Sequence, residues 1–226
     1  MLVKDLQLIV VYQYPVLVDL LKQNGYKLNT GFIGTPYMNI VLSDHGYDDV
    51  AYKMFQQKEY PSWCYPVYQG ATTIWERWNS YTLVNGFGPV DMNSFNHYSY
   101  GAIEDWMMAY GAGIQRDEDK PGYKHIILQP RIGGTLGYTS AKFHTVYGEV
   151  ASAWRSIKPD KNADAADYGY TYEATVPANT TATLTLPLHK GKIEVMEGRK
   201  GIKSYRQSEG KMMYEIGSGK YIFRVR

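Results

Sequence analysis

Residues 117–128 read DEDKPGYKHIIL, and the character of the chain changes across this stretch. Before it, apolar residues recur at spacings of three and four, which is typical of amphipathic helices. After it, short runs rich in Val, Ile, Thr and Tyr alternate with clusters of Gly, Pro and Asn, which is typical of strands and turns. The sequence therefore predicts two domains: a helical one over residues 1–116 and an antiparallel β-sandwich over residues 117–226.

Three helices are expected early in the chain. An apolar stripe over residues 6–21 predicts a helix that ends near Asn24 and Gly25, where glycine can supply the left-handed cap. The Thr35-Pro36 pair predicts a second helix, with Thr35 as its cap, that stops near Gly46. Acidic residues from position 48 favour the start of a third helix.

Two more helical segments are expected before residue 117. Residues 70–78 form a short helix-compatible run after an aromatic loop between prolines. The longest helix is expected to begin at a Ser94 or Asn96 cap and to carry an apolar face as far as Ile114. Beyond residue 117, seven strands are predicted, at residues 125–128, 145–154, 170–176, 181–186, 193–196, 212–216 and 221–225.

Composition excludes several classes of protein. The 24 Lys and Arg against 22 Asp and Glu leave a net charge of +2, far from the basic field of a nucleic-acid-binding protein. Cys64 has no second cysteine with which to form a disulfide, and the histidines lack metal-ligand spacing. The apolar run near the N-terminus is too short and too interrupted to span a membrane. We therefore expect no metal, no cofactor, no nucleic-acid partner and no membrane partner.

Aromatic residues are unusually common for so hydrophilic a chain. There are 22 Tyr, 5 Trp and 6 Phe, yet the mean hydropathy is -0.40. Many rings are therefore expected at partly solvent-exposed positions, where a hydroxyl or indole forms a hydrogen bond with a polar partner. Sugar-binding clefts have this character, and so do many structural interfaces.

Glu76 is the first candidate for chemistry. It lies between Trp75 and Trp78 in the stretch GATTIWERW at residues 70–78. A carboxylate flanked by indoles suits a general base in a sugar site, because the rings stack on sugar faces and exclude bulk water. The alternative is a helix whose two indoles are in the core and whose Glu76 and Arg77 are solvated.

His97 is the second candidate, in the stretch SFNHY at residues 94–98. An imidazole at a helix start can donate a hydrogen bond to a sugar hydroxyl. The alternative is a capping histidine bonded to the backbone.

Five motifs of the chain occur, in the same order, in a known family. They are TGFIGTPY at 30–37, EYPSW at 59–63, GATTIWERW at 70–78, SFNHY at 94–98 and PGYKHI at 121–126. Over roughly residues 25–155 the chain thus resembles bacterial α-L-rhamnosidases of glycoside hydrolase family 78. The resemblance implies a catalytic (α/α)6 barrel followed by a C-terminal β-sandwich. It also implies an inverting hydrolase that removes terminal, non-reducing α-L-rhamnose from a rhamnose-containing glycan or glycoside.

The same resemblance implies roles for individual residues of this chain. Glu76 matches the family's general base, and His97 matches a histidine that contacts bound rhamnose. Trp63, Trp75 and Trp78 lie beside these positions and are expected to form pocket walls or to support them.

The chain also departs from the family. The general acid belongs to an earlier acidic, Arg-containing segment that ends in Gly-Trp and Gly-Asp, and the 226 residues hold no counterpart. Residues 1–116 are expected to supply about six helices, only part of an (α/α)6 barrel. We therefore expect the C-terminal portion of a longer enzyme, one that is inactive alone because it carries the general base and lacks the general acid.

Other expectations follow from an incomplete barrel. Apolar helix faces left exposed would favour self-association. A non-catalytic carbohydrate-binding or barrel-completing assembly module is the alternative function. The sequence leaves the cellular compartment open.

Overall fold

The computed structural model describes residues 2–157 and 169–226, and it describes side chains from residue 13 onward. The chain forms two compact units, Met1–Glu104 and Asp105–Arg226. The units divide ahead of the change in sequence pattern at residue 117. Two contacts tie residues in this offset to the second unit: the Gly111 carbonyl accepts from the Trp154 indole at 2.9 Å, and strand β3 (Ile114–Arg116) is hydrogen-bonded to β4 (His125–Leu128).

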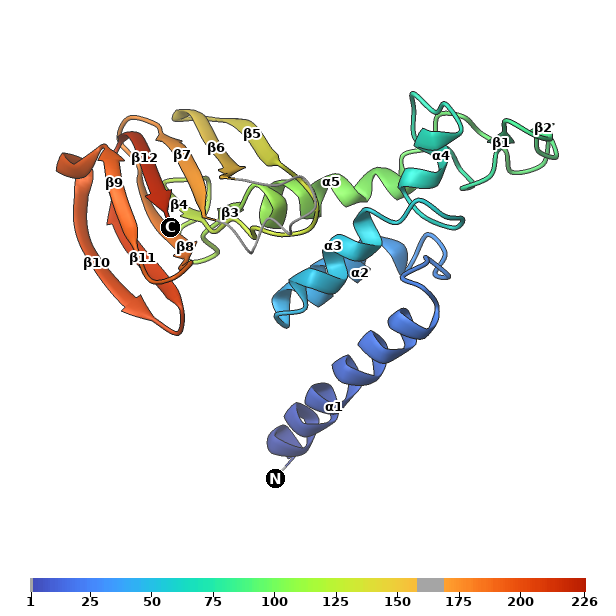
Figure 1. The fold of residues 1–226 in the computed structure, drawn as a ribbon, viewed down its shortest axis with the longest axis horizontal. Coiled ribbons are helices and arrows are strands. Elements are labelled where there is room, and N and C mark those ends of the chain that lie inside the picture. Colours follow the sequence, from blue (N-terminus) through green and yellow to red (C-terminus); the bar gives the residue numbers. More distant parts are fainter. Residues whose placement is uncertain (1, 158–168) are drawn as a thin grey trace. The chain divides into compact units, whose positions relative to one another are not determined.

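Helix α1 (Leu2–Gln23) confirms the first predicted helix and its end before Gly25 (Figure 1). Val18 and Leu21 of the predicted stripe are buried, whereas Tyr14 and Leu17 are half-buried. The side chains of residues 2–12 are not described. Val16 and Leu20 lie on the exposed side of the helix, so α1 presents apolar side chains to solvent as well as to the core.

Helices α2 (Thr35–Asp44) and α3 (Asp48–Phe55) lie side by side and confirm the next two predictions (Figure 1). The buried Asn39 side chain ties them together by donating to the Ala51 carbonyl at 3.0 Å. The prediction of Thr35 as the cap is wrong. Gly34 occupies the cap position of α2, and the Thr35 hydroxyl instead donates to the Thr30 carbonyl at 2.6 Å.

Residues 56–98 contain little regular structure. Helix α4 (Cys64–Tyr68) is one short turn, and β1 (Tyr81–Thr82) and β2 (Gly86–Phe87) form a small hairpin. The helix predicted at residues 70–78 is wrong. This segment instead forms backbone hydrogen bonds with residues 94–97. The backbone groups that make these bonds are not used in the hydrogen bonds of a helix.

The helix predicted from Ser94 or Asn96 to Ile114 is confirmed over residues 99–111, but its start, its end and its rank as the longest helix are wrong. The helical segment starts later, as a 3-10 turn (Ser99–Ala102), continues as α5 (Ile103–Trp106) and ends in a π turn (Met107–Gly111). Within the described residues α1 is the longest helix. Ile114 lies in β3, because Gly113, at φ +80, turns the chain out of the helix.

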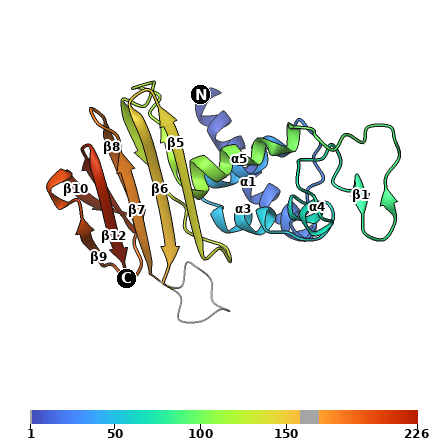
Figure 2. The same cartoon turned by 90° about the horizontal axis from the view of Figure 1, so that it is seen from above.

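The second unit contains two five-stranded sheets. One sheet has the order β10-β11-β8-β4-β3 and the other the order β5-β6-β7-β12-β9. Figure 2 shows β5, β6, β7 and β12 side by side. The remaining strands are β5 (Tyr138–Thr145), β6 (Gly148–Ser156), β7 (Tyr170–Val176), β8 (Thr181–Pro187), β9 (Ile193–Glu197), β10 (Ile202–Ser208), β11 (Lys211–Ile216) and β12 (Gly219–Val225).

A single buried cluster between the two sheets forms the core of this sandwich. Both sheets contribute large side chains to it, including Trp154 and Phe223 from one sheet and Leu184 and Ile216 from the other. Burial alternates along β7, as expected of a strand with one face in the core, whereas Leu184, Thr185 and Leu186 of β8 are all buried.

All seven predicted strands are confirmed, with one correction to the topology. The sandwich is not purely antiparallel, because β4 and β8 pair in parallel. The chain leaves the first sheet after β4, builds β5, β6 and β7 in the second sheet, and returns beside β4 in the same direction. Strands β5 and β10 were not predicted because their side chains are mostly exposed and polar.

Candidate functional site

Backbone hydrogen bonds join the segments that carry Glu76 and His97, although the two residues lie far apart in the sequence. The His97 N–H donates to the Ile74 carbonyl at 2.9 Å, and the Glu76 N–H donates to the Ser94 carbonyl at 2.9 Å. The Thr73 hydroxyl also donates to the Phe95 carbonyl. Residues 73–76 and 94–97 therefore run alongside each other in opposite directions, with both candidate side chains on this paired segment.

The Glu76 carboxylate is held at one oxygen. The Ser94 N–H donates to Oε2 at 2.8 Å, and this bond fixes the orientation of the half-buried side chain. Among the described residues, Oε1 has no protein partner. That oxygen can accept a hydrogen bond from a water molecule, as a general base must.

The His97 ring is fixed by stacking and by the backbone. It stacks on Phe32, with ring centroids 4.9 Å apart and planes 11° from parallel. Its Nδ1 accepts from the Ser99 N–H at 3.4 Å, as the capping interpretation expects. That bond assigns the proton of the neutral ring to Nε2, which has no protein partner within the described residues. The ring can therefore cap the backbone through Nδ1 and donate to a ligand through Nε2.

An aromatic core supports the His97 side of the site. Trp78 stacks on Tyr100 with centroids 3.8 Å apart, and Trp63 meets Trp78 edge-on at 6.0 Å. The Trp63 indole also donates to the Tyr100 carbonyl at 3.1 Å. Phe32 completes the group by contacting Tyr100 at 5.0 Å. Trp63 and Trp78 are both buried, so their rings contact other protein groups and not bulk solvent.

Trp75 belongs to a second aromatic group, on the Glu76 side. Its ring lies edge-on to Phe95 at 5.3 Å and to Tyr81 at 6.5 Å. Phe87 extends this group toward the surface by contacting both Tyr81 and Phe95. Trp75 is buried as well. Both aromatic groups therefore hold the backbone that carries Glu76 and His97.

Two residues of this site were not predicted. Phe32 fixes the His97 ring, and its only signal was membership of the motif at residues 30–37. Ser94 was considered only as a helix cap, whereas its backbone N–H holds Glu76. Every residue except proline has that N–H, so no side-chain pattern could reveal this contact.

Burial raises the pKa of two other groups in this unit. It raises the pKa of the Cys64 thiol, and the thiolate is the nucleophilic form. Burial, with a smaller effect from Tyr60, also raises the pKa of the Tyr100 hydroxyl. Neither group is suited to nucleophilic or base chemistry near neutral pH.

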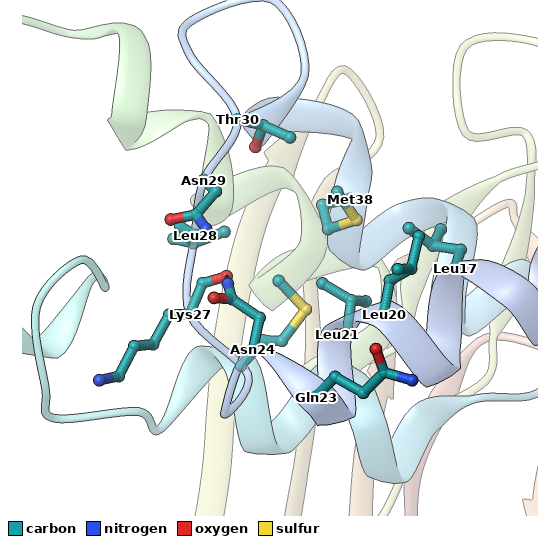
Figure 3. Close-up of a pocket in the computed structure, with 11 residues that line it drawn as sticks. Leu17, Leu20, Leu21, Gln23, Asn24, Lys27, Leu28, Asn29, Thr30 and Met38 are labelled. Carbon is teal, nitrogen blue, oxygen red and sulfur yellow. Dashed lines mark hydrogen bonds between the residues drawn. The ribbon is translucent and has the colours of Figure 1, made fainter.

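A separate hollow of about 540 Å³ lies between α1, α2 and the loop that follows α1 (Figure 3). Its lining is largely apolar, with Leu20, Leu28 and Met38 among the residues that face it. Figure 3 shows the Lys27 ammonium pointing away from the leucines of α1. None of the five predicted site residues lines this hollow.

Neither a metal centre nor a membrane span is found in the described part of the chain. Residues 2–157 and 169–226 hold no group of three or more His, Cys, Asp and Glu placed to bind a metal ion. In the same ranges no helix combines the length and the apolar character needed to cross a bilayer.

A helical unit that carries a carboxylate and an imidazole among aromatic rings, joined to a β-sandwich, has the character expected of a segment of a carbohydrate-active enzyme. Residues 6–110 match the bacterial α-L-rhamnosidase six-hairpin glycosidase domain, and residues 113–201 match the bacterial α-L-rhamnosidase C-terminal domain. The chain belongs to the bacterial α-L-rhamnosidase family, as the five motifs indicated.

Individual relatives agree with this assignment. An α-L-rhamnosidase of Streptomyces avermitilis is 37% identical over 92% of this chain and 19% of its own length. One of Formosa agariphila is 38% identical over 93% of this chain and 22% of its own length. The crystal structure of an S. avermitilis α-L-rhamnosidase complexed with L-rhamnose has a TM-score of 0.79 and 37% identity, over 93% of this chain and 19% of that one. The chain thus spans about a fifth of the length of these relatives.

Proposed function

We propose that this chain is a segment of an inverting α-L-rhamnosidase that removes terminal, non-reducing α-L-rhamnose. In this proposal Glu76 is the general base and His97 binds the sugar. The general acid would come from a polypeptide segment outside the 226 residues. An inverting enzyme places its two carboxyl groups about 6.5–9.5 Å apart, with the attacking water on the base side.

One observation carries the proposal. The paired segments 73–76 and 94–97 carry a carboxylate and an imidazole, and among the described residues one oxygen of the first and one nitrogen of the second have no partner. The carboxylate oxygen can orient and deprotonate water, and the Nε2–H can donate to a sugar hydroxyl. Membership of the rhamnosidase family supplies the identity of the sugar.

The remaining roles follow from the same proposal. Residues 1–116 would form part of an (α/α)6 barrel, and residues 117–226 the C-terminal β-sandwich domain. Trp63, Trp75 and Trp78 would support the site from beneath, because all three are buried against other rings. Rings that are more exposed, such as Tyr98, are better placed to touch the apolar face of rhamnose.

A chimera tests the role of Glu76. This segment would replace its counterpart in the S. avermitilis relative, and the chimera would be assayed on an aryl α-L-rhamnoside. We expect Glu76→Gln to lower kcat about 10²–10⁴-fold, because a general base contributes that much. Glu104→Gln is the control, since Glu104 is an exposed carboxylate in α5. Near-normal turnover in Glu76→Gln would reject the assignment.

The isolated 226-residue chain gives a complementary test. It should release no aglycone from the same rhamnoside, because in this proposal the general acid comes from a segment outside the 226 residues. Robust turnover by the purified chain would overturn the proposal that the acid lies elsewhere.

A barrel-completing or carbohydrate-binding module without catalysis is the second candidate. The exposed apolar side chains of Val16 and Leu20 on α1, and of Val84 and Val90 around the hairpin, favour it. An active chimera whose activity depends on Glu76 would exclude a purely non-catalytic role.

A further inference from the structure

A groove of about 630 Å³ opens on the flank of the sandwich, where the edge strands of the two sheets face each other. Strand β9 is the last strand of one sheet and β10 the last strand of the other. The groove is lined by Ile193, Val195, Arg199, Ile202, Lys203, Ser204, Tyr205, Met212 and Tyr214. Its volume is in the range of small-molecule sites.

One wall of the groove carries two tyrosines beside Ile202 and Met212, and the other wall is aliphatic. Tyr205 of β10 lies directly opposite Tyr214 of β11, and their ring centroids are 6.1 Å apart. Tyr214 is buried in the core, whereas Tyr205 is 71% exposed, so one ring is anchored and the other is available to a ligand. Ile193 and Val195 of β9 form the facing wall.

The charges of the groove are all positive. Among its described lining residues, Arg199 and Lys203 are the charged ones, and neither forms an ion pair with another described residue. The nearest carboxylates along the strands are directed elsewhere. Glu215 accepts from the Thr183 hydroxyl at 2.8 Å, and Glu194 lies between Ile193 and Val195, so its side chain points to the other face of the sheet.

We propose that this groove is a second carbohydrate site, which binds an acidic saccharide through a uronate residue. A sugar ring presents an apolar face that suits the exposed Tyr205 ring. A guanidinium and an ammonium beside that ring would bind a carboxylate, the guanidinium with two parallel hydrogen bonds.

This site is independent of the Glu76 site. It lies in the second compact unit, and β10 and β11 fall beyond residues 113–201, the range that matches the C-terminal domain of the family. Its function does not require turnover, so binding can be measured on the 226-residue chain whether or not the chain is a hydrolase.

Calorimetry with trigalacturonate tests the proposal, and neutral maltotriose is the comparison ligand. We expect trigalacturonate to bind at least tenfold more tightly, because only it can pair with Arg199 and Lys203. Tyr205→Ala should weaken binding about tenfold by removing the stacking ring, and Tyr205→Phe should restore most of it. Arg199→Gln combined with Lys203→Gln should weaken binding about tenfold and flatten its dependence on salt.

Matched controls lie on the opposite edge of the second sheet. Tyr138→Ala and Lys142→Gln remove an exposed ring and a cation from β5 and should leave the affinity unchanged. Equal binding of both trisaccharides, equal losses in the control variants, or no heat signal with trigalacturonate would each overturn the proposal. Tighter binding of benzoate than of trigalacturonate would also overturn it, because the groove would then select an aromatic acid.

Discussion

At the scale of single residues, the three tryptophans near the site are alike in burial but not in bonding. The Trp63 Nε1–H donates to the Tyr100 carbonyl. The Trp75 Nε1–H has no protein partner within the described residues. The sequence indicated that these indoles belong near Glu76, but it could not tell which of them also serves as a hydrogen-bond donor.

This difference makes a matched pair of substitutions informative. Trp63→Phe should destabilise the helical unit by about 0.5–1.5 kcal/mol more than Trp75→Phe, because both lose ring area but only the first loses a buried hydrogen bond. Urea unfolding followed by circular dichroism at 222 nm measures the difference. Equal losses in the two variants would mean that the indole bond contributes nothing to stability.

At the scale of elements, the transition from helix to strand is decided by a few glycines. The π turn ends at Gly111, whose carbonyl accepts from the Trp154 indole at 2.9 Å. Two residues later, Gly113 has a φ of +80 and lies against the backbone of the Gln129-Pro130 pair. The predicted helix extended to Ile114 because this residue is apolar and has helical spacing from Tyr110. Ile114 is apolar for another reason: it is buried in the core between the sheets.

Alanine at the two glycines should therefore behave differently. A Cβ on Gly113 would lie 2.1 Å from the Pro130 nitrogen, so we expect Gly113→Ala to cost about 2 kcal/mol or more. A Cβ on Gly111 meets no heavy atom within 4 Å, so Gly111→Ala should change stability by less than about 1 kcal/mol. Thermal unfolding monitored at 218 nm compares them, and a tolerated Gly113→Ala would contradict the close approach.

At the scale of the whole molecule, several large apolar side chains of the helical unit are exposed. Val16 and Leu20 are 58% and 56% exposed and lie one helical turn apart on α1. Leu20 also faces the apolar hollow of Figure 3. The net charge of +2 gives little electrostatic repulsion between copies.

We therefore expect the purified chain to self-associate as its concentration rises. Val16→Lys combined with Leu20→Lys should shift light scattering toward monomer, because it removes the apolar pair and adds two charges. Gln13→Lys combined with Gln23→Lys adds the same charges at exposed polar positions of α1 and should have a smaller effect. A wild-type chain that stays monomeric at all concentrations would refute this expectation.

The sequence by itself determined the family, the change from helix to strand, helices α1 to α3 and seven of the sandwich strands. These features follow from the local periodicity of buried side chains and from ordered motifs, both of which are present in the one-dimensional chain. It also singled out Glu76 and His97, because carboxylate, imidazole and indole side chains in those motifs are chemically distinctive.

Only the tertiary structure decided that residues 73–76 pair with residues 94–97, that β4 and β8 run parallel, and that the polar strands β5 and β10 close the sheets. It also decided that Tyr205 and two cations line one groove. The physical reason is that backbone hydrogen bonds between distant segments use groups common to nearly all residues. The types of side chain in a segment therefore do not show which distant segment its backbone pairs with.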